Sequence, residues 1–265
     1  MKHQTSNPLI ERFEKMDRWW VLVVIVVCLI IMLAVFKPDP YLRIVRFVAD
    51  GIWVTFYTTM ISFLLVLVLG LFGGLGRISK VPIIRGIASV YVEIVRGIPL
   101  LVQLIFWYFA FPSLLQDLGD QWGIVSFSGY KANPLAMAII GLTFCYAAYM
   151  SEVYRAGIES IPKGQMEAAR SLGMTYVQAM WHIILPQAFR MILPPVGNEF
   201  VTLLKDSSLV SVVAVADMTR RGREFMAANF IPVETWMMVA LLYLVLTLLA
   251  ARFVTWLEKN SKYER

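Results

Sequence analysis

The sequence has little charge. Asp, Glu, Lys and Arg make up 16% of its 265 residues, whereas a soluble domain carries about a quarter. Hydrophobic residues make up 59%, against about half in a soluble domain. This balance excludes an ordinary soluble domain and indicates an integral membrane protein.

Cysteine and histidine are also scarce, with two of each. Cys28 and Cys145 both lie inside apolar runs, and His3 and His182 are far apart in the sequence. Disulfide frameworks and Cys/His metal sites both require closely spaced groups of these residues. The sequence therefore predicts neither a disulfide-stabilised fold nor a metal site.

Motifs that bind phosphate or carry a nucleophile are missing. A P-loop requires Gly followed directly by Lys, and no Gly-Lys pair occurs in this chain. Neither H-E-x-x-H nor G-x-S-x-G is present. The formal net charge is +6, but the basic residues lie between apolar runs and form no block with interleaved aromatics. We therefore expect no catalytic residue, no cofactor bound by this chain and no nucleic-acid partner.

What the sequence has instead is long apolar runs. Each is close to the ~20 residues that cross a bilayer, and helices satisfy their own backbone hydrogen bonds in lipid. No small-x-small cleavage site follows the first run, so we interpret it as a retained helix. The sequence predicts an all-α, polytopic membrane protein with six transmembrane helices, at about 19–36, 52–75, 98–115, 134–151, 191–216 and 235–257.

Lys and Arg are unevenly distributed between the two sides of these runs. Sixteen of the 24 lie in connections on one side, seven lie on the other, and Lys205 lies inside a run. Cytoplasmic connections carry the excess, so both termini and the 160–186 connection are expected in the cytoplasm. Residues 77–97 stay ambiguous: they are either a cytoplasmic surface segment or the start of a long third helix that kinks at Gly97 and Pro99.

Residues 160–186 are polar and rich in helix formers, which predicts a helical hairpin. Gly173 supplies a left-handed stop for the first helix. Thr175 and Gln178 form a T-x-x-Q capping box for the second, which is expected to end at Pro186. The pattern fits equally well a cover for the cytoplasmic helix ends and a docking element for a soluble partner.

The spacing inside this hairpin is specific. The order is E-A-A at 167–169, three residues, Gly173, nine residues, and I-I-L-P at 183–186. This pattern resembles the cytoplasmic EAA loop of ABC importer permeases. The stretches VEIVRGIPLLVQLIFWYF, EVYRAGIESIP and LPQAFRMILPPVGNEFVTLLKDSSLVSVV extend the resemblance to the polar amino-acid permeases of the histidine, glutamine and arginine type, over roughly 50–257.

The resemblance implies a type I ABC importer core of five transmembrane helices. It assigns residues 49–257 to the ABC transporter type-1 transmembrane domain, with the coupling loop at about 160–186. Residues 1–48 would then be a cytoplasmic N-terminus with one extra transmembrane helix, and residues 258–265 a cytoplasmic tail.

In that family the loop forms a coupling helix that sits in a groove of a separate ATPase subunit. Ala168 and Ala169 would allow close approach to the groove wall, and Glu167 and Arg170 would make contacts at its rim. The residues expected to couple to the ATPase are Glu167, Ala168, Ala169, Arg170, Ser171 and Gly173.

The resemblance also implies the partners. An ABC ATPase dimer would bind ATP and Mg²⁺, because this chain has no P-loop of its own. A second permease chain, identical or paralogous, would complete the path, and an extracytoplasmic binding protein would deliver the amino acid. The membrane would be the inner, or plasma, membrane of a prokaryote.

Ionisable residues inside the fifth run suggest a translocation path. Glu199 and Asp206 are seven residues apart and share a helix face, with Thr202 between them. Intramembrane charges usually face cavities, which favours a path over a structural ion pair with Lys205. The expected path residues are Glu199, Thr202, Asp206, Ser207 and Ser208, with Tyr149 and Cys145 on the fourth run.

The expected function is the permease subunit of a binding-protein-dependent ABC importer for a polar amino acid. The acidic path residues would suit a cationic amino acid. Two other classes stay open. An ion-coupled secondary transporter would use Glu199, Lys205 and Asp206 as a proton relay, although no inverted repeat is visible. A membrane scaffold that docks a soluble partner would explain the hairpin but not the acids.

Overall fold

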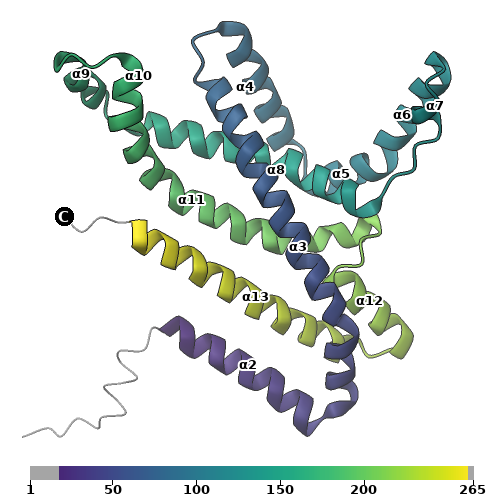
Figure 1. The fold of residues 1–265 in the computed structure, drawn as a ribbon. Coiled ribbons are helices and arrows are strands. Elements are labelled where there is room, and N and C mark those ends of the chain that lie inside the picture. Colours follow the sequence, from purple (N-terminus) through teal and green to yellow (C-terminus); the bar gives the residue numbers. More distant parts are fainter. Residues whose placement is uncertain (1–17, 262–265) are drawn as a thin grey trace, which may run out of the picture.

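The computed structural model describes residues 18–261 (Figure 1). Every regular element in that range is a helix, which confirms the all-α prediction. Residues 1–17 and 262–265 lie outside the described residues, and with them most of the predicted cytoplasmic N-terminus and part of the predicted tail at 258–265.

Long helices alternate with short helical segments along the chain. Two of these segments, η1 and η2, are π-helical turns, and η3 is a 3₁₀-helix. The elements are α2 (Arg18–Phe36), α3 (Pro38–Arg77), α4 (Pro82–Gly97), α5 (Leu100–Ile105), η1 (Phe106–Ala110), α6 (Phe111–Trp122), α7 (Val125–Ser128), α8 (Pro134–Glu159), α9 (Lys163–Ser171), α10 (Tyr176–Ala179), η2 (Met180–Ile184), α11 (Leu185–Asp206), η3 (Ser207–Val213), α12 (Met218–Asn229) and α13 (Pro232–Ser261).

Within the described residues, five helices are long and apolar enough to cross a membrane. They correspond to five of the six predicted runs and confirm a multi-pass membrane protein. The run predicted at 191–216 is not among them, because α11 carries Arg190, Glu199 and Lys205 and ends at Asp206, where η3 follows. The count of six transmembrane helices therefore stays a prediction.

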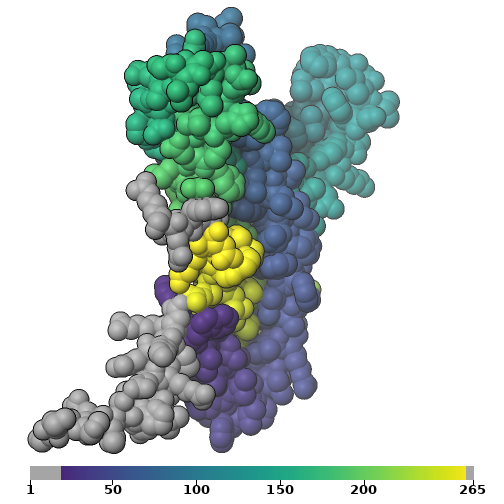
Figure 2. Space-filling view, turned by 60° about the vertical axis from the view of Figure 1, so that its left-hand side comes forward, coloured from purple at the N-terminus to yellow at the C-terminus, as the bar shows by residue number. Residues whose placement is uncertain are grey.

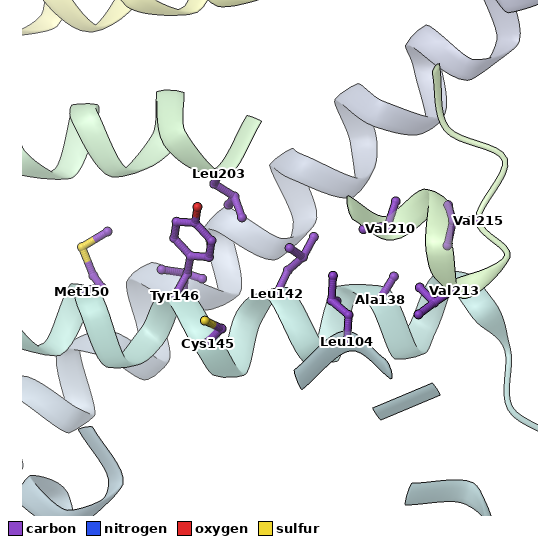
Figure 3. Packing of buried hydrophobic residues seen from close by; sticks show 11 residues of the cluster. Leu104, Ala138, Leu142, Cys145, Tyr146, Met150, Leu203, Val210, Val213 and Val215 are labelled. Atoms are coloured by element: carbon purple, nitrogen blue, oxygen red, sulfur yellow. The ribbon is translucent and has the colours of Figure 1, made fainter. Parts of the chain in front are cut away.

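Helices α3 and α8 form the centre of the molecule and lie in close contact. Small residues make this contact possible: a Cβ added to Gly73 would lie 2.1 Å from Ser151 Oγ, and one added to Gly74 would lie 2.8 Å from the Cβ of Tyr154. Side chains of α5, α11, η3 and the loop after it pack around α8 (Figure 3). The buried cluster includes Leu104, Ala138, Leu142, Cys145, Tyr146, Met150, Leu203, Val210, Val213 and Val215.

Residues 77–97, which the sequence left ambiguous, include a separate amphipathic helix. This helix, α4, buries one face against α3 and α8. It ends at Gly97 because Ile98, which precedes Pro99, takes an extended backbone. The Gln103 side chain then donates hydrogen bonds from Nε2 to the carbonyl oxygens of Val95 and Ile98, each at 2.8 Å, and so holds α5 against the end of α4.

The hairpin and the α12 region lie at opposite ends of the molecule. Helices α9 and α10 lie at the end that holds the turn between α3 and α4, whereas α12 and the junction of α2 with α3 lie at the other end (Figure 1). Helix α2 packs along α13 and α3. Helices α6 and α7 stand apart from the other helices, as Figure 2 shows in space-filling form. The long helices connect the two ends.

Candidate functional site

The predicted helical hairpin is present. Helix α9 ends at Ser171, and Gly173 then turns the chain in the left-handed conformation, with φ of 84°. Thr175 and Gln178 form the predicted capping box: the Gln178 N–H donates to Thr175 Oγ1 at 3.3 Å, and the Thr175 N–H donates to Gln178 Oε1 at 2.9 Å. Local sequence signals therefore build the whole turn.

The prediction that the second helix ends at Pro186 was wrong. The helix continues through the π-helical turn η2, in which the N–H of Leu185 bonds to the carbonyl oxygen of Met180. The wider turn leaves room for Pro186, which has no N–H, in the first turn of α11. The chain is consequently helical without a break over residues 176–206.

The predicted coupling residues lie on the first helix of the hairpin and in its turn. Glu167, Ala168 and Arg170 are exposed, whereas Ala169 is buried. The Ser171 hydroxyl donates to the carbonyl oxygen of Glu167 at 3.0 Å. Of the two alanines, Ala168 is the one that faces outward, and the role of this group in coupling stays a prediction.

Three large apolar residues on the hairpin are exposed, and two of them, Val177 and Trp181, were missed from the sequence. Leu172, Val177 and Trp181 are 82%, 72% and 69% exposed. Their signal in the sequence is the i, i+4 spacing of Val177 and Trp181, which places both on one helix face. The hairpin also touches the turn after α3, because the Lys80 ammonium lies 5.2 Å from the Tyr176 ring centre. These apolar side chains are available for contact with a partner subunit or with the lipid surface.

A pocket of about 350 Å³ lies between α4, α8 and α11, and we name it the polar pocket for the charged side chains that stand in its mainly apolar wall. Its charged and aromatic lining residues are Arg96, Tyr149, Glu152 and Glu199. The Arg96 guanidinium lies over the Tyr149 ring, 5.1 Å from its centre. Of the predicted path residues, this pocket brings together Tyr149 and Glu199.

Glu152, in the wall of this pocket, is held by two cations. Arg77 at the end of α3 donates to Glu152 Oε2, and Arg155 donates to both carboxylate oxygens, with an Nε–Oε2 distance of 3.1 Å. Arg155 also pairs with Glu159. The network joins α3 to α8 and leaves Glu152 fully hydrogen-bonded.

The other predicted path residues lie farther along α8 and α11. Asp206 accepts a hydrogen bond from the Tyr146 hydroxyl at 2.7 Å. Cys145 is 2% exposed and lies in the buried cluster, 3.5 Å from Gln103 Nε2. These two residues are therefore engaged with protein groups in this conformation, and their contact with a solute stays a prediction.

Three hydroxyl residues complete the predicted set. Thr202 is exposed, and its hydroxyl donates to the carbonyl oxygen of Asn198 at 2.9 Å. Ser207 is buried and donates to the carbonyl oxygen of Leu204 at 2.8 Å, whereas Ser208 is half-buried. None of the three lines the polar pocket. Their place in the path stays a prediction.

The chain was compared with known families and solved structures. Residues 67–263 match the family described as the binding-protein-dependent transport system inner membrane component. The chain belongs to this family. It is 34% identical over 213 residues to the glutamine transport system permease protein of Escherichia coli K12, covering 80% of this chain and 92% of the relative. It is 40% identical over 181 residues to the L-cystine transport system permease protein of Bacillus subtilis, covering 68% and 71%.

A solved structure has the same fold. The permease superimposes with a TM-score of 0.73 on a chain from the crystal structure of an amino acid ABC transporter with histidines. The two chains are 33% identical, and the match covers 83% of this chain and 96% of the other. The fold is therefore that of ABC importer transmembrane subunits.

At the end of the permease opposite the hairpin, Asp217 caps α12. Its carboxylate accepts hydrogen bonds from the N–H groups of Thr219 and Arg220, each at 3.0 Å, and from the Tyr243 hydroxyl at 3.2 Å. Burial raises the pKa of Asp217, and the hydrogen bonds from Arg220 and Thr219 oppose that shift. The N–H of Met218 donates to Thr55 Oγ1 at 3.2 Å, which ties α12 to α3.

Ion pairs add to this connection between α12 and α3. Arg221 pairs with Asp50 of α3 and with Glu224, and Arg43 donates to Asn229 Oδ1 at 3.0 Å. The first half of α3 and the helix α12 are therefore tied together. Within residues 18–261, no group of His, Cys, Asp and Glu side chains is arranged to hold a metal ion.

Arg96 is the pocket residue of this permease that the sequence did not reveal. Periodicity relates residues on one helix, and Arg96 ends α4 while Glu199 lies on α11. They share a pocket because α4 packs against α8, next to α11. The available signal was an Arg directly before Gly97, three residues after Glu93, in an otherwise apolar stretch.

Proposed function

We propose that this chain is the permease subunit of an ABC importer for an amino acid. It forms half of the translocation path and couples that path to a separate ATPase through the hairpin. The relatives named above transport glutamine and L-cystine, and the similar solved structure is titled as an amino acid transporter. These relatives support an amino acid as the transported solute.

One observation carries this proposal: a single unbroken helical segment joins the hairpin to the polar pocket. Residues 176–206 begin at the capped turn after Gly173 and contain Glu199 in the pocket wall. The segment contains Pro186, Pro194 and Pro195 before Glu199, yet it stays helical throughout. A displacement of the hairpin can therefore reach Glu199 along one continuous helical segment, as alternating access by rocking of helices requires.

The partners follow from the same proposal. An ABC ATPase dimer binds ATP and Mg²⁺ and docks on Glu167, Ala168 and Arg170 together with the exposed Leu172 and Val177. A second permease chain completes the path, and an extracytoplasmic binding protein delivers the solute. The match to a binding-protein-dependent transport family supports this composition.

The proposed location is the inner, or plasma, membrane of a prokaryote, with both termini and the hairpin in the cytoplasm. The excess of Lys and Arg on the hairpin side supports this orientation. A secondary transporter would not require the hairpin, and a scaffold would not require the charged pocket. The family match, the hairpin and the pocket together favour the importer over both.

The test is the variant Glu167→Arg in proteoliposomes that contain the permease, its ATPase and its binding protein. We expect amino-acid-stimulated ATP hydrolysis to fall at least about tenfold, because a reversed charge at the rim of a docking groove weakens the contact. Co-purification of the ATPase with the permease should fall in parallel. Wild type without partner-dependent hydrolysis for any amino acid would refute the importer function.

The matched control is Asp120→Arg, an equal charge reversal on the exposed surface of α6, away from the hairpin. It should leave co-purification of the ATPase unchanged. Equal loss of the ATPase in both variants would assign the effect to misfolding and would contradict a docking role for Glu167.

A further inference from the structure

A second cavity lies on the face of α11 that points away from the polar pocket. It has a volume of about 530 Å³ and lies between α3, α11 and α13. Its wall consists of aliphatic and aromatic side chains together with Thr59, whose hydroxyl donates to the carbonyl oxygen of Thr55 at 2.8 Å. Among the described residues, no charged side chain lines it. We call this cavity the apolar groove.

The apolar groove is about as long as one leaflet of a bilayer is thick. Its lining residues lie within 56–67 of α3, 193–204 of α11 and 246–257 of α13. At 1.5 Å per residue, each stretch is about 16 Å long. Half of the roughly 30 Å hydrocarbon core is about 15 Å. The groove therefore matches the acyl chains of one leaflet, whereas a transmembrane helix would require a seam about twice as long.

The rim of the groove is bulky. Phe56 and Leu64 of α3 and Phe253 of α13 are 44%, 57% and 55% exposed. Helices in membranes pack together through small residues, which let their backbones approach. Gly197 already serves this purpose within the chain, since a Cβ added to it would lie 2.1 Å from Val254 Cγ1. The open part of the groove therefore suits a flexible chain of methylene groups better than another helix.

Two exposed cations lie beyond the end of the groove on the hairpin side. Helix α11 begins on that side and α13 ends there (Figure 1). Arg190 lies three residues before Leu193, the first groove residue of α11, and Lys259 lies two residues after Leu257, the last groove residue of α13. Each cation is therefore within about one helical turn of the groove.

An anionic phospholipid matches both the groove and these cations. Its acyl chain gains from contact with an apolar wall, and its phosphate lies at the boundary of the hydrocarbon core. Lys and Arg side chains reach that boundary from helix ends and attract anionic headgroups. Basic sites between membrane helices bind such lipids in this way.

We propose that the apolar groove binds an acyl chain of an anionic phospholipid from the leaflet on the hairpin side, with its phosphate held by Arg190 and Lys259. The bound lipid packs against one face of α11, while the opposite face carries Glu199 in the polar pocket. The proposal does not depend on which solute the permease carries.

The test is native mass spectrometry of the purified permease–ATPase complex, titrated in detergent with two lipids that share the same oleoyl chains. One is phosphatidylglycerol, which is anionic, and the other is phosphatidylcholine, which has no net charge. Wild type should hold one phosphatidylglycerol per permease chain at least about tenfold more tightly than phosphatidylcholine, because two cations attract its headgroup.

The variant that fills the groove is Ala250→Phe. Ala250 is half-buried in the groove wall, and a phenyl ring there takes the place of the acyl chain. Binding of both lipids should weaken at least about tenfold. The matched control is Ala110→Phe, the same change at an exposed position of η1 outside the groove, and it should bind both lipids as wild type does.

The charge of the headgroup site is tested with the double variant Arg190→Gln and Lys259→Gln. It leaves the groove intact, so phosphatidylglycerol should bind only as tightly as phosphatidylcholine. The matched control is Arg46→Gln with Lys131→Gln, which removes two exposed cations at the opposite end of the molecule and should keep the preference of wild type. Because these four residues are exposed, the comparison does not depend on repacking of the interior.

Three results would overturn the proposal. They are a wild type without preference for phosphatidylglycerol, undiminished lipid binding by Ala250→Phe, and a second permease chain in the groove. For the third, Phe253→Cys is introduced after replacement of Cys28 and Cys145, and membranes that contain the complex are treated with a short bismaleimide. A lipid-filled groove should give no crosslinked permease pair. ATP-driven uptake of an amino acid by wild type tests the importer function separately.

Discussion

At the scale of single residues, Asp217 is a buried carboxylate at the end of the permease opposite the hairpin. It is fully buried, and it caps α12 while contacting Tyr243 of α13. A buried carboxylate is unfavourable unless hydrogen bonds satisfy it. Three donors do so here, yet burial still raises its pKa.

The raised pKa gives Asp217 a specific pH signature. Because the folded state holds the proton more tightly than the unfolded chain, its contribution to stability is full below the unfolded pKa of about 3.9 and is lost as pH rises through the folded pKa. The stability of wild type relative to Asp217→Asn should therefore fall as pH rises above about 4. Thermal unfolding in detergent measures the difference.

Asp217→Ala also removes the cap and should lose about 1 kcal/mol of stability across this pH range. Asp120→Asn, at an exposed carboxylate, should show no such pH dependence and is the control. A pH-independent difference between wild type and Asp217→Asn would contradict the raised pKa.

At the scale of elements, the close contact between α3 and α8 depends on small residues, chiefly glycines of α3. Gly73 faces Ser151 so closely that an added Cβ would lie 2.1 Å from its hydroxyl oxygen. Membrane helices associate by close packing of such small residues, since lipid offers little hydrophobic driving force between them. The α3–α8 pair therefore behaves as one rigid unit.

Gly73→Val should separate the two helices locally and destabilise the permease by about 1–3 kcal/mol, as overpacking does. Thermal unfolding in detergent checks this. The control is Gly86→Val, at a helical glycine of α4 with nothing within 4 Å of an added Cβ, which should change stability little. Ser151→Gly should restore part of the loss in the Gly73→Val background; absence of rescue would locate the strain elsewhere.

At the scale of the whole molecule, the proposed topology places the hairpin and α7 on opposite sides of the membrane. Two single-cysteine variants test this orientation, Leu172→Cys on the hairpin and Val125→Cys in α7, at positions 82% and 83% exposed. Cys28 and Cys145 are replaced in the background. A membrane-impermeant maleimide added to intact cells should label Val125→Cys, and Leu172→Cys only after permeabilisation. The reverse pattern would invert the proposed topology.

How far the sequence predicts this structure depends on the range of the interactions involved. The hairpin turn was predictable, because Gly173 and the pair Thr175 and Gln178 act within a few residues of one another. The unbroken helix through Pro186 was not, because a π-helical turn leaves no clear signature in the sequence. The pairing of Tyr146 with Asp206 joins two helices sixty residues apart, and periodicity says nothing about such a register.

The same limit applies to the pocket. Glu199 and Tyr149 were found as polar or aromatic residues on predicted spans, and the structure places both in the pocket wall. Arg96 was missed because its position depends on where α4 ends relative to α8 and α11. One residue supplied by tertiary packing thus adds a cation to a pocket wall in which the sequence had predicted only acidic, aromatic and hydroxyl residues.

The length of α3 has a mechanical consequence. At 40 residues the helix is about 60 Å long, twice the roughly 30 Å of the hydrocarbon core. One end is fixed to α8 through Arg77 and Glu152, and the half that contains the other end is fixed to α12 through Asp50 and Arg221. A rod of this length works as a lever: a tilt of about 10° around its middle moves its ends about 5 Å in opposite directions. A single tilt of α3 would then open the path at one face of the membrane and close it at the other. No series of side-chain rearrangements is needed to link the two ends.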